Sequence, residues 1–179
     1  RLPKLAHPRP VDRVRRLLAD DAHTRAGIAR QRLTRLRQLH TQIAELTTQI
    51  TQLVQRFDTA LTQICGIAAV AEAELLAEVG DISRYGTKAQ FAMSNGTAPL
   101  PVSSGRTNRH RLNRGGNRQL NRILHYIALT QISRDPQGRA YYHRKLAEGR
   151  TKPDALRCLK RRISDRVYQT LRRQPPAGC

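Results

Sequence analysis

Hydrophobic residues recur at helical spacing along most of this chain. Residues 11–64 contain no proline and one glycine, and their apolar positions alternate steps of three and four residues over four heptads. That period is typical of a left-handed coiled coil; an antiparallel helical hairpin within one chain is the alternative. We expect a long helical segment that joins two copies of the chain along a seam of Leu36, Leu39, Ile43, Leu46, Ile50, Leu53, Phe57, Ala60 and Ile64.

Two short helices are predicted next. The first covers residues 69–79, where apolar residues keep a helical spacing, and it ends at Gly80. The second lies within residues 87–99 and is stopped by Asn95-Gly96 and then by Pro99, because glycine and proline both interrupt a helix.

Two longer helices, over residues 117–133 and 152–173, complete the pattern. Their expected buried stripes are Leu120, Ile123, Leu124, Ile127 and Ile132 in the first and Leu156, Leu159, Ile163, Val167 and Leu171 in the second. No segment alternates apolar and polar residues as a half-buried strand does. The expected fold class is therefore all-α.

The pattern divides the chain into four parts. We expect a proline-rich linker over residues 1–10, a helical or coiled-coil segment over 11–63, a C-terminal domain over 64–173 and a tail over 174–179. The C-terminal domain would begin with a helix-hairpin-helix-like element.

Gly66 separates two predicted helices in that element. The turn amides of a helix-hairpin-helix can hold a DNA phosphate at a helix N-terminus. Such turns usually read Gly-hydrophobic-Gly, and here the third residue is Ala68. A plain helical connector fits the same spacing.

Positive charge dominates the composition. The chain has 33 Lys and Arg against 13 Asp and Glu, a formal charge of +20, and residues 103–173 alone carry a net +15. A field of this sign favours a polyanion, and nucleic acid is the obvious one. The excess is mostly arginine, whose planar fork suits phosphate and guanine contacts.

Cysteine spacing and hydropathy indicate the cellular compartment and argue against a metal site and a membrane span. The three cysteines show no C-x-x-C spacing and the six histidines no metal-ligand spacing, so no metal site is predicted. No stretch approaches the roughly 18 apolar residues of a membrane span, and no signal peptide is recognisable. We expect a reduced, cytoplasmic protein.

The segment PVSSGRTNRHRLNRGGNRQ, residues 101–119, carries the candidate chemistry. A serine hydroxyl is a poor nucleophile unless other groups assist it, and phosphodiester transfer needs positive charge around the phosphorus. The loop supplies both, and the Gly-Gly pair would open a helix whose free amides face the same ligand. The alternative is an exposed loop that binds the DNA backbone with its serines as hydrogen-bond donors only.

The order of the motifs resembles the C-terminal domain of the IS-one-ten (IS110) family of transposases, relatives of the Piv DNA invertases. The resemblance rests on GIAAVAEAELLAEVGDISRYGTKAQFA, NGTAP, SSG, HRLNRGGNRQLNRILHYIA and GRAYYHRKLAEGRTKPDALRCLKRRISDRVY. It covers about residues 61–173, with the coiled coil upstream in its expected place. Ala68 and the run FAMSNGTAP depart from the family's usual pattern, and neither touches the serine.

The resemblance implies a two-part DNA recombinase of an insertion sequence. A RuvC-like acidic domain would bind Mg²⁺, and a serine of the C-terminal domain would attack DNA. Ser104 is the implied nucleophile, with Ser103 as the alternative. The implied DNA-contacting residues, together with Gly66, are Gly105, Arg106, Arg109, Arg111, Arg114, Gly115, Gly116, Asn117, Arg118 and Arg122.

The partners that follow are DNA, a second copy of the chain through the coiled coil, and, as in some relatives, a structured guide RNA. The acidic domain is not in this sequence, so this chain by itself would bind nucleic acid without completing recombination. A non-catalytic basic helical binder, or an inactive transposase remnant, is the alternative function.

Several other residues are expected to have structural roles. Glu74 and Glu78 share a helix face and are interpreted as solvated charges. His125 is interpreted as a residue at the boundary of its helix's buried stripe, and Tyr141-Tyr142 as packing against the last helix.

Overall fold

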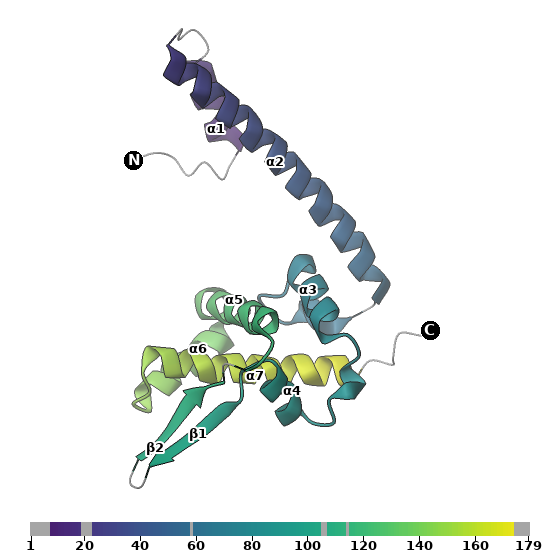
Figure 1. Ribbon diagram of the computed structural model, residues 1–179, viewed down its shortest axis with the longest axis vertical. Coiled ribbons are helices and arrows are strands. Elements are labelled where there is room, and N and C mark those ends of the chain that lie inside the picture. Colours follow the sequence, from purple (N-terminus) through teal and green to yellow (C-terminus); the bar gives the residue numbers. More distant parts are fainter. Residues whose placement is uncertain (1–7, 19–22, 58, 105–106, 114, 174–179) are drawn as a thin grey trace. The chain divides into compact units, whose positions relative to one another are not determined.

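The computed structural model describes residues 8–18, 23–57, 59–104, 107–113 and 115–173. The chain separates into two compact units, divided after Gln49, and each is described by itself. Within the described residues there are seven α-helices and two strands (Figure 1). The all-α prediction is confirmed for the fold as a whole.

The N-terminal unit contains α1 (Pro8–Leu17) and most of α2 (Thr24–Val54). An ion pair joins Arg37 to Asp12, and Arg30 Nη1 donates a hydrogen bond to the carbonyl of Leu18 at 2.6 Å. Val11 and Leu33 are buried here. These contacts hold α1 against the first half of α2.

The predicted heptad seam lies largely exposed on α2. Leu39, Ile43, Leu46 and Leu53 are 39–59% exposed in a single chain. The seam is shorter than predicted, because α2 ends at Val54 and the chain continues in the 3-10 turns η1 (Gln55–Phe57) and η2 (Ala60–Gln63). The prediction that Ile64 extends the seam is wrong.

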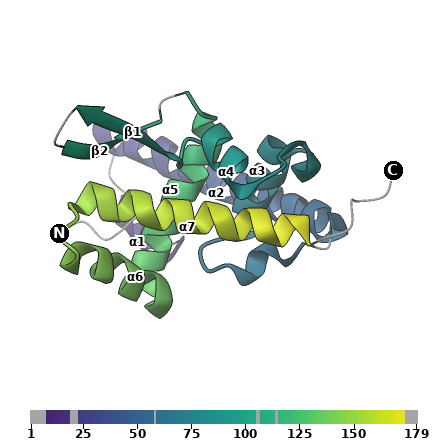
Figure 2. The ribbon, with the colours of Figure 1, turned by 90° about the horizontal axis from the view of Figure 1, so that it is seen from below.

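The C-terminal unit contains five complete helices, and α7 (Lys152–Arg172) contacts three of the other four. Helix α7 contacts α4 (Lys88–Ser94), α5 (Arg118–Arg134) and α6 (Pro136–Ala147), and α3 (Ala69–Val79) packs on α5. Figure 2 shows α7 crossing the unit with α4 and α6 on either side of it.

The core of this unit consists of the predicted stripes. Ile64, Leu120, Leu124, Ile127, Leu159, Ile163 and Val167 are each at most 2% exposed. Burying one such side chain contributes about 1.5–3 kcal/mol to folding. Leu156 and Ile132 are only partly buried at the edge of this core. The core, more than local propensity, therefore determines how the helices pack.

Side-chain caps fix where the helices begin. Thr87 and Gln90 form a reciprocal capping box at α4. Asp135 accepts hydrogen bonds from the first amides of α6, with Pro136 in the first turn. Thr151 caps α7 in the same way. These caps satisfy amides that have no partner inside a helix.

One part of the secondary structure was not predicted. Residues 99–112 form an antiparallel hairpin of β1 (Pro99–Ser104) and β2 (Thr107–Leu112), in which Ser104 pairs with Thr107. The expectation that no segment forms a strand is wrong here. The strands of the hairpin do not alternate apolar and polar residues, so the pattern that predicts a half-buried strand gives no signal here. No helix of the described part of the chain is long and apolar enough to cross a membrane.

Glu72 of α3 is 3% exposed, and burial raises the pKa of its carboxyl group. The folded state thus binds this proton more tightly than the unfolded chain does. The carboxylate therefore costs stability as the pH rises above its ordinary pKa, near 4.3. We expect Glu72→Gln to raise the melting temperature at pH 7.

This gain should disappear below about pH 4, where Glu72 is protonated in the unfolded chain as well as in the folded one. Glu45→Gln, at an exposed position of α2, is the matched control and should change little. Thermal unfolding followed by circular dichroism at several pH values measures both. A destabilised Glu72→Gln at pH 7 would show that the carboxylate has a favourable partner in the fold.

Candidate nucleic-acid interface

The two candidate serines end the first strand of the hairpin. Ser103 pairs with Asn108 and Ser104 with Thr107 across the ladder, so both lie at its tip. The hairpin projects from the helical part of the C-terminal unit (Figure 1).

The arginines predicted around the serines fall into two groups. The backbones of Arg109 and Arg111 lie on β2, opposite Val102 and Leu100. Gly105, Arg106 and Arg114, which were also predicted to contact DNA, lie outside the described residues.

The root of the hairpin is fastened to the end of α4. Asn113 Nδ2 donates to the carbonyl of Met93 at 3.0 Å, and the amide of Asn117 donates to the carbonyl of Ser94 at 2.6 Å. Gly116 lies directly on the backbone of residues 95–96: a Cβ at this position would be 2.7 Å from Gly96 Cα. Gly116 is therefore required by packing.

The first amides of α5 were predicted to be free for a ligand, and this prediction is wrong. Asn117 Oδ1 accepts hydrogen bonds from the amides of Gln119 and Leu120, at 2.9 and 3.1 Å. The same side chain donates to Glu78 Oε2 at 2.7 Å. Asn117 is thus a helix cap that also joins α5 to α3, because its amide group offers both an acceptor and donors.

Glu74 and Glu78 were interpreted as solvated charges; the Glu74 side chain does stay 41% exposed, but both carboxylates also have partners. Glu78 binds Asn117, and Glu74 forms an ion pair with Arg122 at 3.2 Å. Arg122 also donates to Gln119 Oε1 at 3.0 Å. Both carboxylates therefore hold α3 against the start of α5, and Arg122 has less free charge to offer a ligand.

Gly66 also has a packing environment. Its φ of +95° is a conformation that favours glycine, and a Cβ would lie 3.1 Å from the carbonyl oxygen of Ile127 in α5. The element before it is the short 3-10 turn η2, so the described structure here is a 3-10 turn, a glycine and α3.

A chain of polar side chains runs through the interior beside the hairpin root. Asn95, completely buried, donates from Nδ2 to Ser164 Oγ at 2.8 Å. Its carbonyl accepts from Asn121 Nδ2 at 2.9 Å, and Asn121 Oδ1 accepts from the ammonium of Lys160. These hydrogen-bonded side chains therefore connect the core around α7 with a surface groove.

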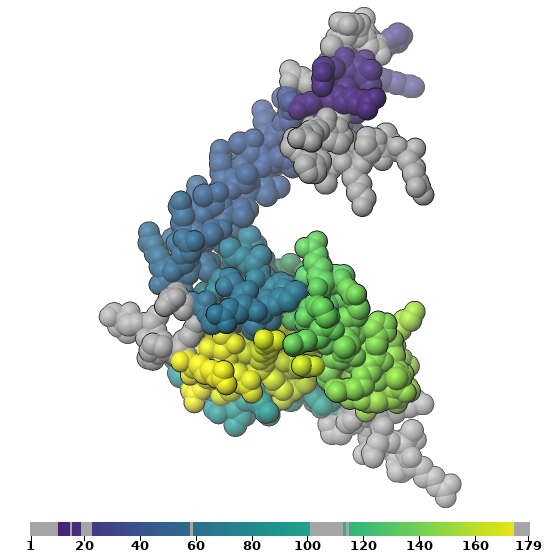
Figure 3. Space-filling model, turned by 180° about the vertical axis from the view of Figure 1, so that it is seen from behind, coloured from purple at the N-terminus to yellow at the C-terminus, as the bar shows by residue number. Residues whose placement is uncertain are grey.

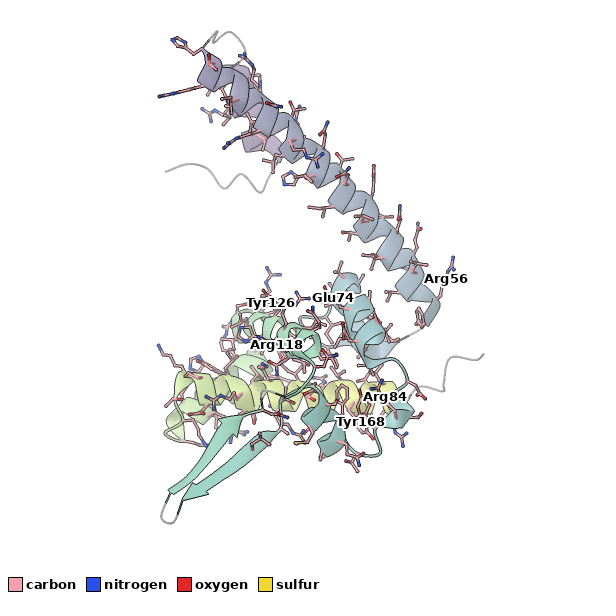
Figure 4. All side chains as sticks on the ribbon, viewed as in Figure 1. Arg56, Glu74, Arg84, Arg118, Tyr126 and Tyr168 are labelled. Atoms are coloured by element: carbon pink, nitrogen blue, oxygen red, sulfur yellow. The ribbon has the colours of Figure 1, made fainter. Side chains whose placement is uncertain are left out.

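That groove has a volume of about 630 Å³ and lies between the hairpin root, α5 and α7. Among the described residues its lining contains four basic side chains and no carboxylate: Asn113, Gly116, Arg118, Asn121, Arg122, His125 and Lys160. Arg118 stands at the start of α5 in Figure 4. Such a surface suits an anion, and phosphate is the anion that nucleic acids provide.

His125 belongs to this groove. Burial and the nearby ammonium of Lys160 lower the pKa of its imidazole. The sequence indicated a boundary residue, and the structure places it half-buried at the groove wall.

Sequence reasoning missed Lys160, Asn95 and Asn121. Lys160 had a usable signal: together with Ser164 it occupies the buried phase of α7, where the other positions are apolar. A polar pair within an apolar stripe indicates a buried network. Asn95 gave no such signal, since Asn-Gly is also an ordinary helix stop.

A second hollow of about 220 Å³ lies where α6 and α7 meet the start of β1. Tyr141 lines it and also packs against the core, as predicted. Cations surround its ring, with Arg162 and Arg144 at 4.7 and 5.1 Å from the centroid. In Figure 3, which shows the back of the unit, α7 (yellow) lies beside the green helices α5 and α6.

Among the described residues no three His, Cys, Asp or Glu side chains lie close enough together to hold a metal ion. The described lining of the groove supplies positive charge and hydrogen-bond donors. That combination suits a phosphate group.

Residues 58–143 match the sequence model of a family described as Transposase IS116/IS110/IS902 family. The match includes α3, α4, the hairpin and α5, and with them every described groove residue except Lys160. The predicted resemblance is thereby confirmed for this segment.

Three curated relatives of the chain come from insertion elements. It is 41% identical over 107 residues to the insertion element IS110 uncharacterized 43.6 kDa protein of Streptomyces coelicolor, which is 58% of this chain and 26% of the relative. It is 38% identical over 109 residues to the IS116 uncharacterized 44.8 kDa protein of Streptomyces clavuligerus (60% and 27%). It is 34% identical over 109 residues to the IS900 uncharacterized 42 kDa protein of Mycobacterium paratuberculosis (60% and 27%). The chain thus matches about a quarter of the length of these relatives.

The close contact at Gly116 makes a direct prediction. Gly116→Ala forces a methyl group against the backbone of residues 95–96, which cannot move without disturbing the buried Asn95. We expect a loss of roughly 1–3 kcal/mol in unfolding free energy, as for overpacking elsewhere. Urea denaturation measures it.

Gly115→Ala is the matched control one residue earlier. A Cβ there would lie 3.5 Å from Asn113 Oδ1, an ordinary contact, so its effect should stay within about 0.5 kcal/mol. Equal stability of the two variants would mean that the hairpin root is not held as tightly as described.

Proposed function

We propose that this chain is part of a DNA transposase of an insertion element and that its hairpin presents Ser104 to DNA as a nucleophile. The observation that carries the proposal is the place of Ser-Ser-Gly. Ser103 and Ser104 end the first strand of a projecting hairpin, in a segment that matches a transposase family. The cationic groove at the hairpin root would bind the DNA backbone.

The hairpin geometry supports the expectation that another component completes the active site. At about 3.3 Å per residue, the tip of a six-residue strand lies about 17 Å from its root. The cations of the groove are therefore too far along the hairpin to stabilise charge at Ser104. We propose that a Mg²⁺-binding acidic domain supplies this, in the same protein or in a partner.

The alternative is a basic nucleic-acid binder without catalytic activity. One observation favours it: the groove can bind an anion with no contribution from the serines. A guide RNA as an additional partner, and a cytoplasmic location, remain predictions in either case.

Ser104→Ala separates the two functions. In the transposase completed with its acidic domain, this variant should reduce strand transfer to background and form no covalent protein–DNA adduct, because the attacking oxygen is gone. DNA affinity should be nearly unchanged. A denaturing gel with labelled DNA detects the adduct.

Ser103→Ala is the control and should remain active. If Ser103→Ala loses the adduct instead, the nucleophile is the neighbouring serine. If adduct and transfer persist in both variants, the serine mechanism is wrong. A completed wild-type protein that binds DNA without forming any adduct would support the non-catalytic alternative.

We also propose that the exposed seam of α2 pairs with the same helix of a second copy. Leu46 is 56% exposed at the centre of the seam, and the heptad period is that of two-stranded coiled coils. Leu46→Glu should convert a dimer into a monomer, because it places two carboxylates in the apolar seam. Light scattering with size-exclusion chromatography gives the mass.

Gln49→Glu, at an exposed position of α2 off the seam, adds the same charge and should leave the dimer intact. A monomeric wild-type chain, or equal dissociation of both variants, would remove the seam from the assembly.

A further inference from the structure

Lys160 is a buried cation without a counter-ion. Its side chain belongs to α7, and the residue is 7% exposed. Among the described residues its one hydrogen-bond partner is Asn121 Oδ1, and no carboxylate forms an ion pair with it. An ammonium has three donors, and buried charges in proteins are normally paired. Lys160 is therefore an incomplete ion pair in the protein alone.

The Lys160 side chain is accessible from the groove. Lys160 lines the groove together with Arg118, Arg122 and His125. The neighbouring carboxylates are already used, because Glu74 pairs with Arg122 and Glu78 accepts from Asn117. Nothing among the described groove residues neutralises Lys160 or Arg118.

The geometry points to a bound anion at this place. We propose that Lys160, with Arg118 and His125, binds one phosphodiester of the DNA backbone at the root of the hairpin. The identity of the ligand rests on the proposed function, since the groove itself calls only for a phosphate-like anion. The surrounding C-terminal segment, with its net charge of +15 over residues 103–173, draws a polyanion to this surface.

This site would position DNA and would not act in the chemistry. The hairpin tip lies about 17 Å from its root, so the phosphate held by Lys160 is several nucleotides away from the one that Ser104 would attack. Lys160 is therefore a positioning residue, and it extends the predicted DNA surface beyond residues 105–122.

The titration behaviour of the groove agrees with this assignment. Burial and the neighbouring Arg157 lower the pKa of the Lys160 ammonium. Burial and Lys160 in turn lower the pKa of His125. The other charged groups at the groove, Arg118 and Arg122, are cations as well. A bound anion would raise both pKa values, so that binding and protonation support each other.

Lys160→Met tests the site, because methionine keeps much of the apolar stem and removes the charge. In the full chain, the variant should bind a labelled DNA duplex more weakly. The slope of log K against log[salt] should fall by about 0.9, the value for one lost phosphate contact. The loss should be the same for unrelated sequences. Lys152→Met removes an equal charge from an exposed position of α7 and should leave the slope unchanged.

Stability distinguishes binding from a structural role. Because the folded state binds the Lys160 proton less tightly than the unfolded chain, the charged lysine costs stability at neutral pH. We expect Lys160→Met to melt at the same or a higher temperature than the wild type, while its His125 pKa, followed by NMR, rises. A clearly lower melting temperature with an unchanged salt slope would make Lys160 structural and overturn the proposal.

Two further measurements distinguish a failure of this anion site from a failure of the proposed function. Inorganic phosphate should raise the melting temperature of the wild type more than that of Lys160→Met, whether or not DNA binds. If phosphate stabilises both proteins equally, the anion site is wrong. If phosphate acts only on the wild type but no DNA binds, the proposed function fails and the DNA assignment fails with it. A loss of affinity for RNA of the same sequence, with DNA binding unchanged, would also overturn the DNA assignment.

Discussion

The arrangement of the C-terminal unit depends on one buried side chain, that of Asn95. Its amide donates to Ser164 of α7 at 2.8 Å, and its oxygen accepts from the amide and hydroxyl of Thr97, just before β1. Its backbone carbonyl accepts from Asn121 of α5. A buried polar group that loses a partner costs free energy, so these bonds determine together where α5, α7 and the hairpin lie. Gly116 completes the junction by allowing the chain after the hairpin to lie on the same backbone.

The same network extends from the core to the groove. From Ser164 it passes through Asn95 and Asn121 to Lys160, so the orientation of the cation is fixed by residues that are themselves buried or partly buried. Apolar residues would fill such a space at a lower free-energy cost, because buried charges and polar groups must be desolvated. A polar chain that ends at a surface groove is understandable when its last member has a ligand to bind. The core and the groove are therefore parts of one structure, and a change at the hairpin root should be felt at Lys160.

The parts of the fold that follow from local rules could be predicted from the sequence. The stripes of α5 and α7 were found because burial leaves a 3.6-residue period, and the end of α3 at Gly80 was found because glycine ends helices. The hairpin could not be predicted in this way, because its strands show no alternation of apolar and polar residues. The roles of Asn95, Asn117 and Glu78 depend on partners 39–69 residues away in the sequence, and no local pattern encodes such a distance. Ser104 was singled out by the composition of its loop and by the family resemblance. The groove residues Asn121, His125 and Lys160 are brought together only by the three-dimensional fold.

Charge and fixed geometry have different consequences for binding. A net charge of +20 attracts nucleic acid from any direction and in any register. Exposed arginines that move freely cannot select one position of the DNA backbone, since each can follow the nearest phosphate. Lys160 differs because it is 7% exposed and bonded to Asn121, which limits the positions that its ammonium can take. One fixed contact at the root, together with a hairpin of defined length, would limit which phosphate reaches Ser104. In the proposed transposase the register of the reaction would therefore depend on a few buried groups, and its affinity on the many exposed ones.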